Sequence, residues 1–241
     1  MKHLYTLIFL LLVSTNIIAQ EREILPVNWK QIKEDVNKDP QKVKDLVARL
    51  SATSLDTTLT YQDRILAFYG QSFLTNDEEE KLKIKMYDQK DKGHITESLE
   101  TAKKILEINP LNLEALNHAG QILYAMANDS TANNGITKED AKQYFNRAMR
   151  IFNTIAMTGD GSDKHPFYVT KVSDEYCFMR FYLDLWEYQM QAATSCSDII
   201  TLKKNSKYYN QPKIYFEITR VYELERMQFL KKKKNLIHVN N

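Results

Sequence analysis

The residues best suited to acid–base chemistry lie in a glycine-containing stretch in the second half of the chain. Asp160, Asp163 and His165 stand within it, and Glu175 follows. An imidazole beside carboxylates can hold and transfer protons, so these residues define a candidate enzyme site. Its substrate and reaction stay open. The simpler interpretation, which we prefer, is a turn on the protein surface.

Other catalytic and metal-binding patterns are missing from the sequence. There is no Gly-x-Ser-x-Gly elbow and no glycine-rich phosphate loop, which argues against the common serine hydrolases and phosphate-loop enzymes. The histidines beyond the N-terminus are not paired at the helical spacing of metal ligands; they are His94, His118, His165 and His238. For His118 we expect a hydrogen bond at a helix interface. We therefore expect neither a metal nor a cofactor.

The N-terminus has the pattern of a secretory signal. Lys2 and His3 are followed by an apolar run, and residues 14–19 are polar to small. The run is short for a membrane span, so we expect a signal peptide over residues 1–19 that is cleaved after Ala19. An uncleaved anchor helix is the alternative. The expected location is the periplasm or the medium, and no later segment is apolar enough to span a membrane.

The two cysteines, Cys177 and Cys196, leave two interpretations open. An exported chain meets an oxidising compartment, in which a disulfide between them can form. Two separate buried thiols are an equally good interpretation. Two cysteines do not complete a structural zinc site, which needs four ligands.

The charge of the chain is nearly balanced, with 33 Lys and Arg against 31 Asp and Glu. This argues against a dedicated nucleic-acid-binding protein, which needs a clustered basic face. The lysines at 231–234 fall in residues 228–241, for which we expect a solvated, frayed basic tail. The adjacent Tyr208 and Tyr209 stand in a lysine-bearing loop and are difficult to bury together.

Residues 20–157 have the spacing of packed helices. Capping residues precede several apolar stripes, and they include Asn28, Asp39, Thr60 and Thr137. Asn76, with Glu79 three residues later, is expected to begin a further helix. The segment 99–149 organises this region, because a helix ends at Asn109-Pro110 and another begins a few residues later.

The segment 99–149 resembles the tetratricopeptide repeat, a pair of antiparallel helices with small and large residues at fixed positions. Ala119-Gly120 in mid-helix predicts the close approach of a neighbouring helix, since Gly there costs about 1 kcal/mol relative to Ala. The match covers about one and a half repeats. It implies a groove for a protein or peptide partner, with Asn112, Asn117 and Gln121 beside the apolar stripe.

Residues 158–227 follow a different pattern, which predicts a small α+β module with an antiparallel sheet. A helix begins near Ser173, and residues 186–192 alternate as a strand with one buried face. Residues 198–203 and 213–221 complete the meander. A helix that continues from Ser173 through Gln191 is the competing interpretation. The fold class is therefore α+β and mainly α.

Several short segments resemble a family of exported Bacteroidetes proteins that is described as domain of unknown function 4919. They are residues 55–60 with Ala67-Phe68-Tyr69-Gly70, residues 105–120, Thr158-Gly159-Asp160-Gly161, Asp174-Glu175-Tyr176, and Tyr215-Phe216. The family more often has Tyr where Phe68 stands. The resemblance implies no catalytic residues and no activity.

These observations favour an exported, non-enzymatic protein that binds a protein or peptide partner in the cell envelope. The helical hairpins would present the binding face. The alternative is an enzyme with its site at the junction of the helical and α+β parts, around Asp160, Asp163, His165 and Glu175.

Overall fold

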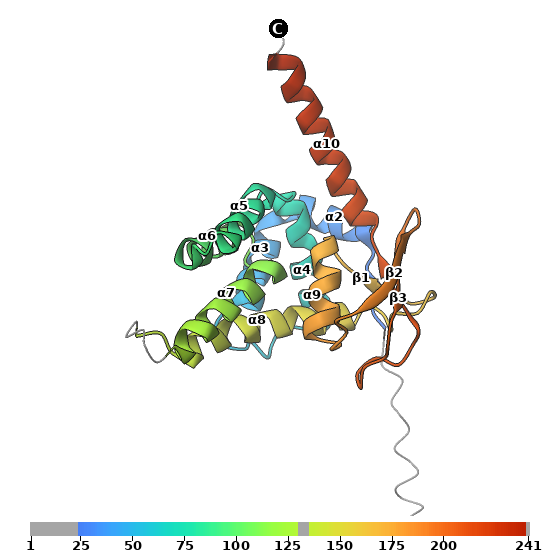
Figure 1. The fold of residues 1–241 in the computed structure, drawn as a ribbon. Helices are drawn as coiled ribbons and strands as arrows, with labels where there is room; N and C mark the ends of the chain where they lie inside the picture. The colour runs from blue at the N-terminus through green and yellow to red at the C-terminus, as the bar shows by residue number, and fades with distance from the viewer. Residues whose placement is uncertain (1–23, 130–134, 240–241) are drawn as a thin grey trace, which may run out of the picture.

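A computed structural model describes residues 24–129 and 135–239, and the expected signal peptide lies outside these ranges. The first part is helical (Figure 1). Its helices are α2 (Trp29–Lys38), α3 (Pro40–Ser51), α4 (Tyr61–Thr75), α5 (Glu80–Asp91), α6 (Ile95–Ile108), α7 (Leu113–Asn128) and α8 (Lys138–Ala156). Successive helices from α5 to α8 pack on one another.

The predicted caps are confirmed at four helix starts. Asn28 and Asp39 each accept a backbone N–H of the first turn of α2 and α3. Thr60 and Thr137 form reciprocal capping boxes at α4 and α8. These contacts satisfy backbone donors that have no partner within the helix, and so they fix where each helix begins.

Asn76 does not begin a helix as predicted. It ends α4 in the left-handed conformation, with φ of 46°, and α5 begins at Glu80. Asparagine tolerates this conformation better than most residues, so the same side chain serves a helix end as well as a start.

The predicted junction between α6 and α7 is confirmed. Asn109 follows the last residue of α6, and Asn112 caps α7 through the backbone N–H of Ala115 at 2.9 Å. Gly120 permits the close approach of α8, because a Cβ there would lie 2.7 Å from the ring of Phe145. The cost of a mid-helix glycine thus has a packing reason.

The second part carries a four-stranded sheet in the order β1-β4-β3-β2. The strands are β1 (Phe167–Tyr168), β2 (Tyr188–Ala193), β3 (Ser197–Leu202) and β4 (Lys213–Glu217). The predicted antiparallel meander is confirmed for β2, β3 and β4, whereas β1 adds a parallel pairing. The sheet is therefore mixed and not wholly antiparallel.

Helix α9 (Val172–Phe181) ends well before Gln191, and Asp184 then adopts a left-handed φ of 55°. The predicted strand after this helix is confirmed, and the competing helix through Gln191 is wrong. Two details of this part differ from the sequence prediction. β2 has no buried face, because it is the edge strand and carries a bulge between Tyr188 and Met190. β4 is shorter than the expected strand, since α10 (Thr219–Val239) begins after it.

Helix α10 also replaces the expected frayed tail over residues 228–239 (Figure 1). The segment contains no Gly or Pro, and its lysines are good helix formers. The first turn of α10 is anchored by the buried Arg220, which donates to the Ser72 carbonyl at 2.6 Å and stacks 3.8 Å from the Phe73 ring centre.

One hydrophobic core joins the two parts of the molecule. Phe178 of α9 lies at its centre, against Phe152 of α8 and against Phe167 and Phe216 of the sheet. Figure 1 shows α9 between the helical part and the strands. The position of α9 consequently decides which side chains of the two parts meet at its ends.

Candidate functional site

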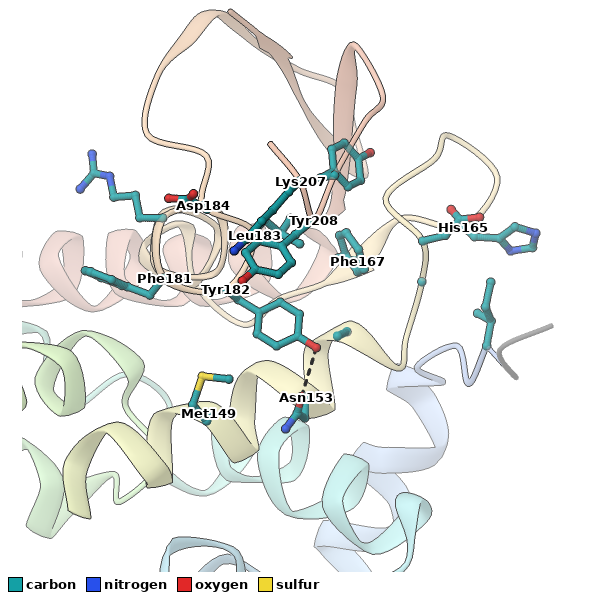
Figure 2. Close-up of a pocket in the computed structure, with 16 residues that line it drawn as sticks. Met149, Asn153, His165, Phe167, Phe181, Tyr182, Leu183, Asp184, Lys207 and Tyr208 are labelled. Carbon is teal, nitrogen blue, oxygen red and sulfur yellow. Dashed lines mark hydrogen bonds between the residues drawn. The ribbon is translucent and has the colours of Figure 1, made fainter. Parts of the chain in front are cut away.

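An open cleft of about 1260 Å³ lies at the C-terminal end of α9. We call it the junction cleft. Helix α8 contributes Met149 and Asn153, the end of α9 and the loop after it contribute residues 180–184, and the β3–β4 loop contributes residues 207–209. The glycine-containing turn supplies Asp160 and His165, and Figure 2 labels the second of them.

Large apolar side chains are exposed along the junction cleft. Tyr208 is 59 % exposed, Met149 41 % and Phe181 38 %. Tyr182, directly after α9, points toward α8, and its hydroxyl donates to Asn153 Oδ1 at 3.1 Å (Figure 2). Apolar side chains grouped at a concave surface, with a few polar groups between them, are typical of binding sites.

The glycine-containing turn is closed by its own backbone and is joined to β4, where the Tyr215 N–H donates to the Gly161 carbonyl at 3.0 Å. The backbone N–H groups of Asp160 and Gly161 both donate to the His165 carbonyl at 3.0 Å. The Tyr209 hydroxyl contacts the carbonyls of Gly161 and Lys213 at 2.9 and 2.8 Å. Gly161 has φ of 78°, a conformation that favours glycine. The motif that suggested catalysis therefore has a structural role.

The structure brings only two of the four acid–base candidates together. Asp160 and His165 both line the junction cleft, whereas Asp163 is not among its lining residues. Burial opposes ionisation of Asp160, but hydrogen bonds from Ser162 lower its pKa overall. An Asp that is stabilised in its charged form is a poor proton donor.

Glu175 lies apart from the junction cleft, in the interior between α9 and β3. It is fully buried and faces Asp198, and neither of its carboxyl oxygens has a hydrogen-bond donor among the described residues. Burial, followed by the nearby Asp198, raises the pKa of Glu175 to about 10. The side chain is therefore a neutral acid at pH 7, away from any substrate that the cleft would hold.

A second cavity of about 500 Å³ lies on the other side of the end of α9. We call it the α7 groove. It shares Arg180 and Phe181 with the junction cleft, and two of the predicted binding residues, Asn117 and Gln121, line it. Asn117 donates to the Leu113 carbonyl within α7, whereas Gln121 is exposed.

Asn112, the third predicted binding residue, does not line the α7 groove. It is buried, caps α7, and donates to Glu79 Oε1 at 3.3 Å. Its type reflects its place at the start of a helix, where a short polar side chain is needed.

His118 lines the α7 groove from a buried position. Its Nε2 lies 2.7 Å from the Ser98 hydroxyl, which lies 2.7 Å from the Met86 carbonyl. Because that carbonyl only accepts, we assign Nε2 as the donor to Ser98. Burial, followed by the charge of Lys90, lowers the pKa of His118 to about 4. The predicted hydrogen bond at a helix interface is confirmed.

The cysteines are not bridged in the structure. Cys177 is buried in α9 and Cys196 is exposed in the turn between β2 and β3. The interpretation as two buried thiols holds for Cys177 alone. Across residues 24–129 and 135–239, no three His, Cys, Asp or Glu side chains are grouped as metal ligands. In the same residues, no helix has the length and apolar content to cross a membrane.

Sequence reasoning missed the residues that shape the two cavities. Phe181, Trp186 and Tyr188 follow one another near the end of α9 and look like core residues in the sequence, yet all three are exposed. The adjacent Tyr208 and Tyr209 were the one available signal, because only one of them can be buried. The structure buries Tyr209 and exposes Tyr208.

Comparisons with known proteins give a family but no activity. No curated protein and no solved structure matches this chain. The profile of one family matches residues 30–227, which include the helical part, the glycine-containing turn, the sheet and the first turns of α10. The chain belongs to that family, which is described as domain of unknown function DUF4919.

Proposed function

We propose that this protein binds an extended segment of a protein partner at the C-terminal end of α9. The observation that carries the proposal is the junction cleft, where Tyr208, Met149 and Phe181 are exposed beside a hollow of about 1260 Å³. A cavity of this size exceeds what most small ligands fill. Its open form suits a chain that enters at one side and leaves at the other.

The arrangement of acid–base residues favours binding over catalysis. Of the four candidates, Glu175 is buried against Asp198, and Asp163 does not line the cleft. Asp160 and His165 remain at the rim, where they can contribute polar contacts. A general acid or base needs to reach the reacting group, and one pair at an open rim gives no enclosed place for it.

We also propose that the binding takes place outside the cytoplasm. The support is the apolar run after Lys2 and His3 and the small residue Ala19 before Gln20. Cell fractionation with N-terminal sequencing tests this location. A mature chain that begins at Gln20 or Glu21 in the periplasm or medium is expected, and an intact chain in the cytoplasm would contradict it.

The binding proposal is tested with a phage-displayed library of random twelve-residue peptides selected on the full chain. Selected peptides are then measured by fluorescence anisotropy against Tyr208→Ala. We expect a loss of affinity of about tenfold or more, because an exposed aromatic anchor at a cavity is a common binding hot spot.

Tyr61→Ala is the matched control. Tyr61 is 55 % exposed, close to the 59 % of Tyr208. A cation lies over each ring, Arg64 over Tyr61 and Lys207 over Tyr208. The control should bind the selected peptides as the unchanged chain does. A library that yields no binder, or equal losses in both variants, would count against the proposal.

A further inference from the structure

Strand β2 has a free edge with outward-pointing backbone groups. It is the last strand of the sheet, and no other strand of the described residues pairs with its outer side. Thr194 N donates to the Ser197 carbonyl at 2.8 Å, so these two form a hydrogen-bonded pair. Hydrogen-bonded and non-hydrogen-bonded pairs alternate along an antiparallel ladder. The backbone N–H and C=O groups of Ala193 and Gln191 therefore point to the free edge.

This edge lacks the usual protection against pairing. β2 contains no proline and no charged residue, and five of its six residues are exposed, with only Gln191 half-buried. Edge strands in monomeric proteins commonly carry lysine, proline or a covering segment. The bulge between Tyr188 and Met190 lies at the far end from Ala193, so the outward groups of Gln191 and Ala193 remain in regular strand.

The same strand begins at the rim of the α7 groove. Trp186 and Tyr188 line the groove directly before and at the start of β2. A segment that paired with β2 would run for about 20 Å, at about 3.3 Å per residue. Continued past Tyr188, it would enter the groove and meet Phe181, whose ring packs edge-on against Trp186 at 5.7 Å.

The α7 groove carries positive charge that the described residues do not neutralise. Lys90 and Arg180 line it, and neither forms an ion pair with a described carboxylate. Glu114, the acidic residue in the groove, accepts from the Tyr87 hydroxyl at 2.7 Å and lies 3.9 Å from Lys83. An acidic side chain of a partner would therefore find two cations available.

We propose that β2 and the α7 groove together bind an acidic, extended peptide segment by strand addition. The backbone of the segment pairs with the outward groups of Gln191 and Ala193, and its carboxylates meet Lys90 and Arg180 in the groove. This inference rests on the proposed function, since it assumes a protein segment as ligand. It adds where the backbone of that segment lies beyond Arg180 and Phe181, which the junction cleft and the α7 groove share, and which charge this stretch carries.

The charge requirement is tested with Lys90→Glu. The peptides selected on the full chain should be enriched in Asp or Glu, and their affinity should fall by about tenfold or more in this variant. Lys85→Glu is the matched control, because it makes the same charge change on α5 at an exposed position outside the groove. The control should bind as the unchanged chain does.

Strand addition is tested with Ala193→Pro, which removes an outward N–H and leaves the β3 ladder intact. Ala193→Val keeps the N–H and serves as control. Affinity should fall only in the proline variant. In the unchanged chain, saturating peptide should slow hydrogen exchange at the amides of Gln191 and Ala193, as expected for new backbone hydrogen bonds.

Three other results would overturn the inference of strand addition. Peptides that respond to Tyr208→Ala but not to Lys90→Glu or Ala193→Pro would overturn this inference and leave the proposed function standing. Selected peptides without acidic residues would also overturn it. So would a concentration-dependent dimer that disappears in Ala193→Pro, because the edge would then pair with a second copy of the chain.

Discussion

The charged side chains at the two ends of α9 differ in burial and in pairing. At the N-terminal end, Lys171 is largely buried and contacts Asp77 and, at 2.8 Å, Glu79. Asn109 donates to the same Glu79 oxygen at 2.7 Å. At the C-terminal end, Arg180 is exposed between two cavities and forms no ion pair within the described residues.

The difference separates residues that hold the fold from residues that are available to a partner. Burial removes water from Lys171 and Glu79, so each charge depends on the other for compensation. Burial alone would lower the pKa of Lys171, but the carboxylates of Glu79 and Asp77 raise it. Burial alone would raise the pKa of Glu79, but Lys171 lowers it. Exposed groups such as Arg180 keep their water and can exchange it for a ligand.

The largest expected effect follows from removing Glu79, the buried acidic partner of Lys171 at the N-terminal end of α9. Glu79→Ala leaves Lys171 buried with only Asp77 as an acidic partner, and the side chains of Asn109 and Asn112 lose their acceptor. We expect a loss of about 3 to 5 kcal/mol in the free energy of unfolding, measured by urea denaturation. Asp88→Ala breaks the exposed pair with Lys92 and should cost less than about 1 kcal/mol. Equal losses in the two variants would contradict the comparison.

The local part of this architecture could be predicted from the sequence. Asn28, Thr60 and Thr137 cap helices through partners three residues away, so their roles are visible in a short window. The turn at Asn109-Pro110 was predicted for the same reason, since neighbouring residues set it. At Gly120 the sequence predicted the close approach of a helix but not the partner, Phe145 of α8.

The long-range part could not be predicted. Lys171 and Glu79 are 92 positions apart, and Arg220 and Ser72 are 148 apart. Nothing in a local pattern distinguishes Glu79 from an ordinary acid of the first helical turn, which is the role that its spacing from Asn76 predicts. The same limit applies to the cavities, because α8, α9 and the β3–β4 loop meet only in the folded chain.

A smaller effect is expected from the buried carboxyl pair, which lies between the two ends of α9. The pKa of Glu175 is raised from 4.5 to about 10, first by burial and then by Asp198. The unfolded chain therefore releases this proton at a lower pH than the folded chain. The stability that the protonated Glu175 provides is complete below about pH 4.5 and is lost as the pH rises toward 10, by at most about 1.4 kcal/mol per unit.

Glu175→Gln removes this titration and keeps the shape of the side chain. Its amide can also donate to Asp198. We expect the variant to be more stable than the unchanged chain by about 1 to 3 kcal/mol at pH 8 and to differ little at pH 4. Urea denaturation at both pH values measures the difference. A variant that is less stable at pH 8 would show that the carboxyl is needed in its charged form.

The smallest expected effect concerns the two adjacent tyrosines at the open end of α9. The Tyr209 hydroxyl contacts the carbonyls of Gly161 and Lys213 in a buried position. Tyr209→Phe removes both contacts and should cost about 1 to 2 kcal/mol, although the Gly161 carbonyl still accepts the Tyr215 N–H. Tyr208→Phe should cost less than about 0.5 kcal/mol, because its ring is exposed and contacts chiefly Lys207. Thermal and urea unfolding compare the two. If Tyr208→Phe destabilised the chain as much as Tyr209→Phe, the exposed aromatic rim would belong to the fold, and its availability to a partner would lose its main support.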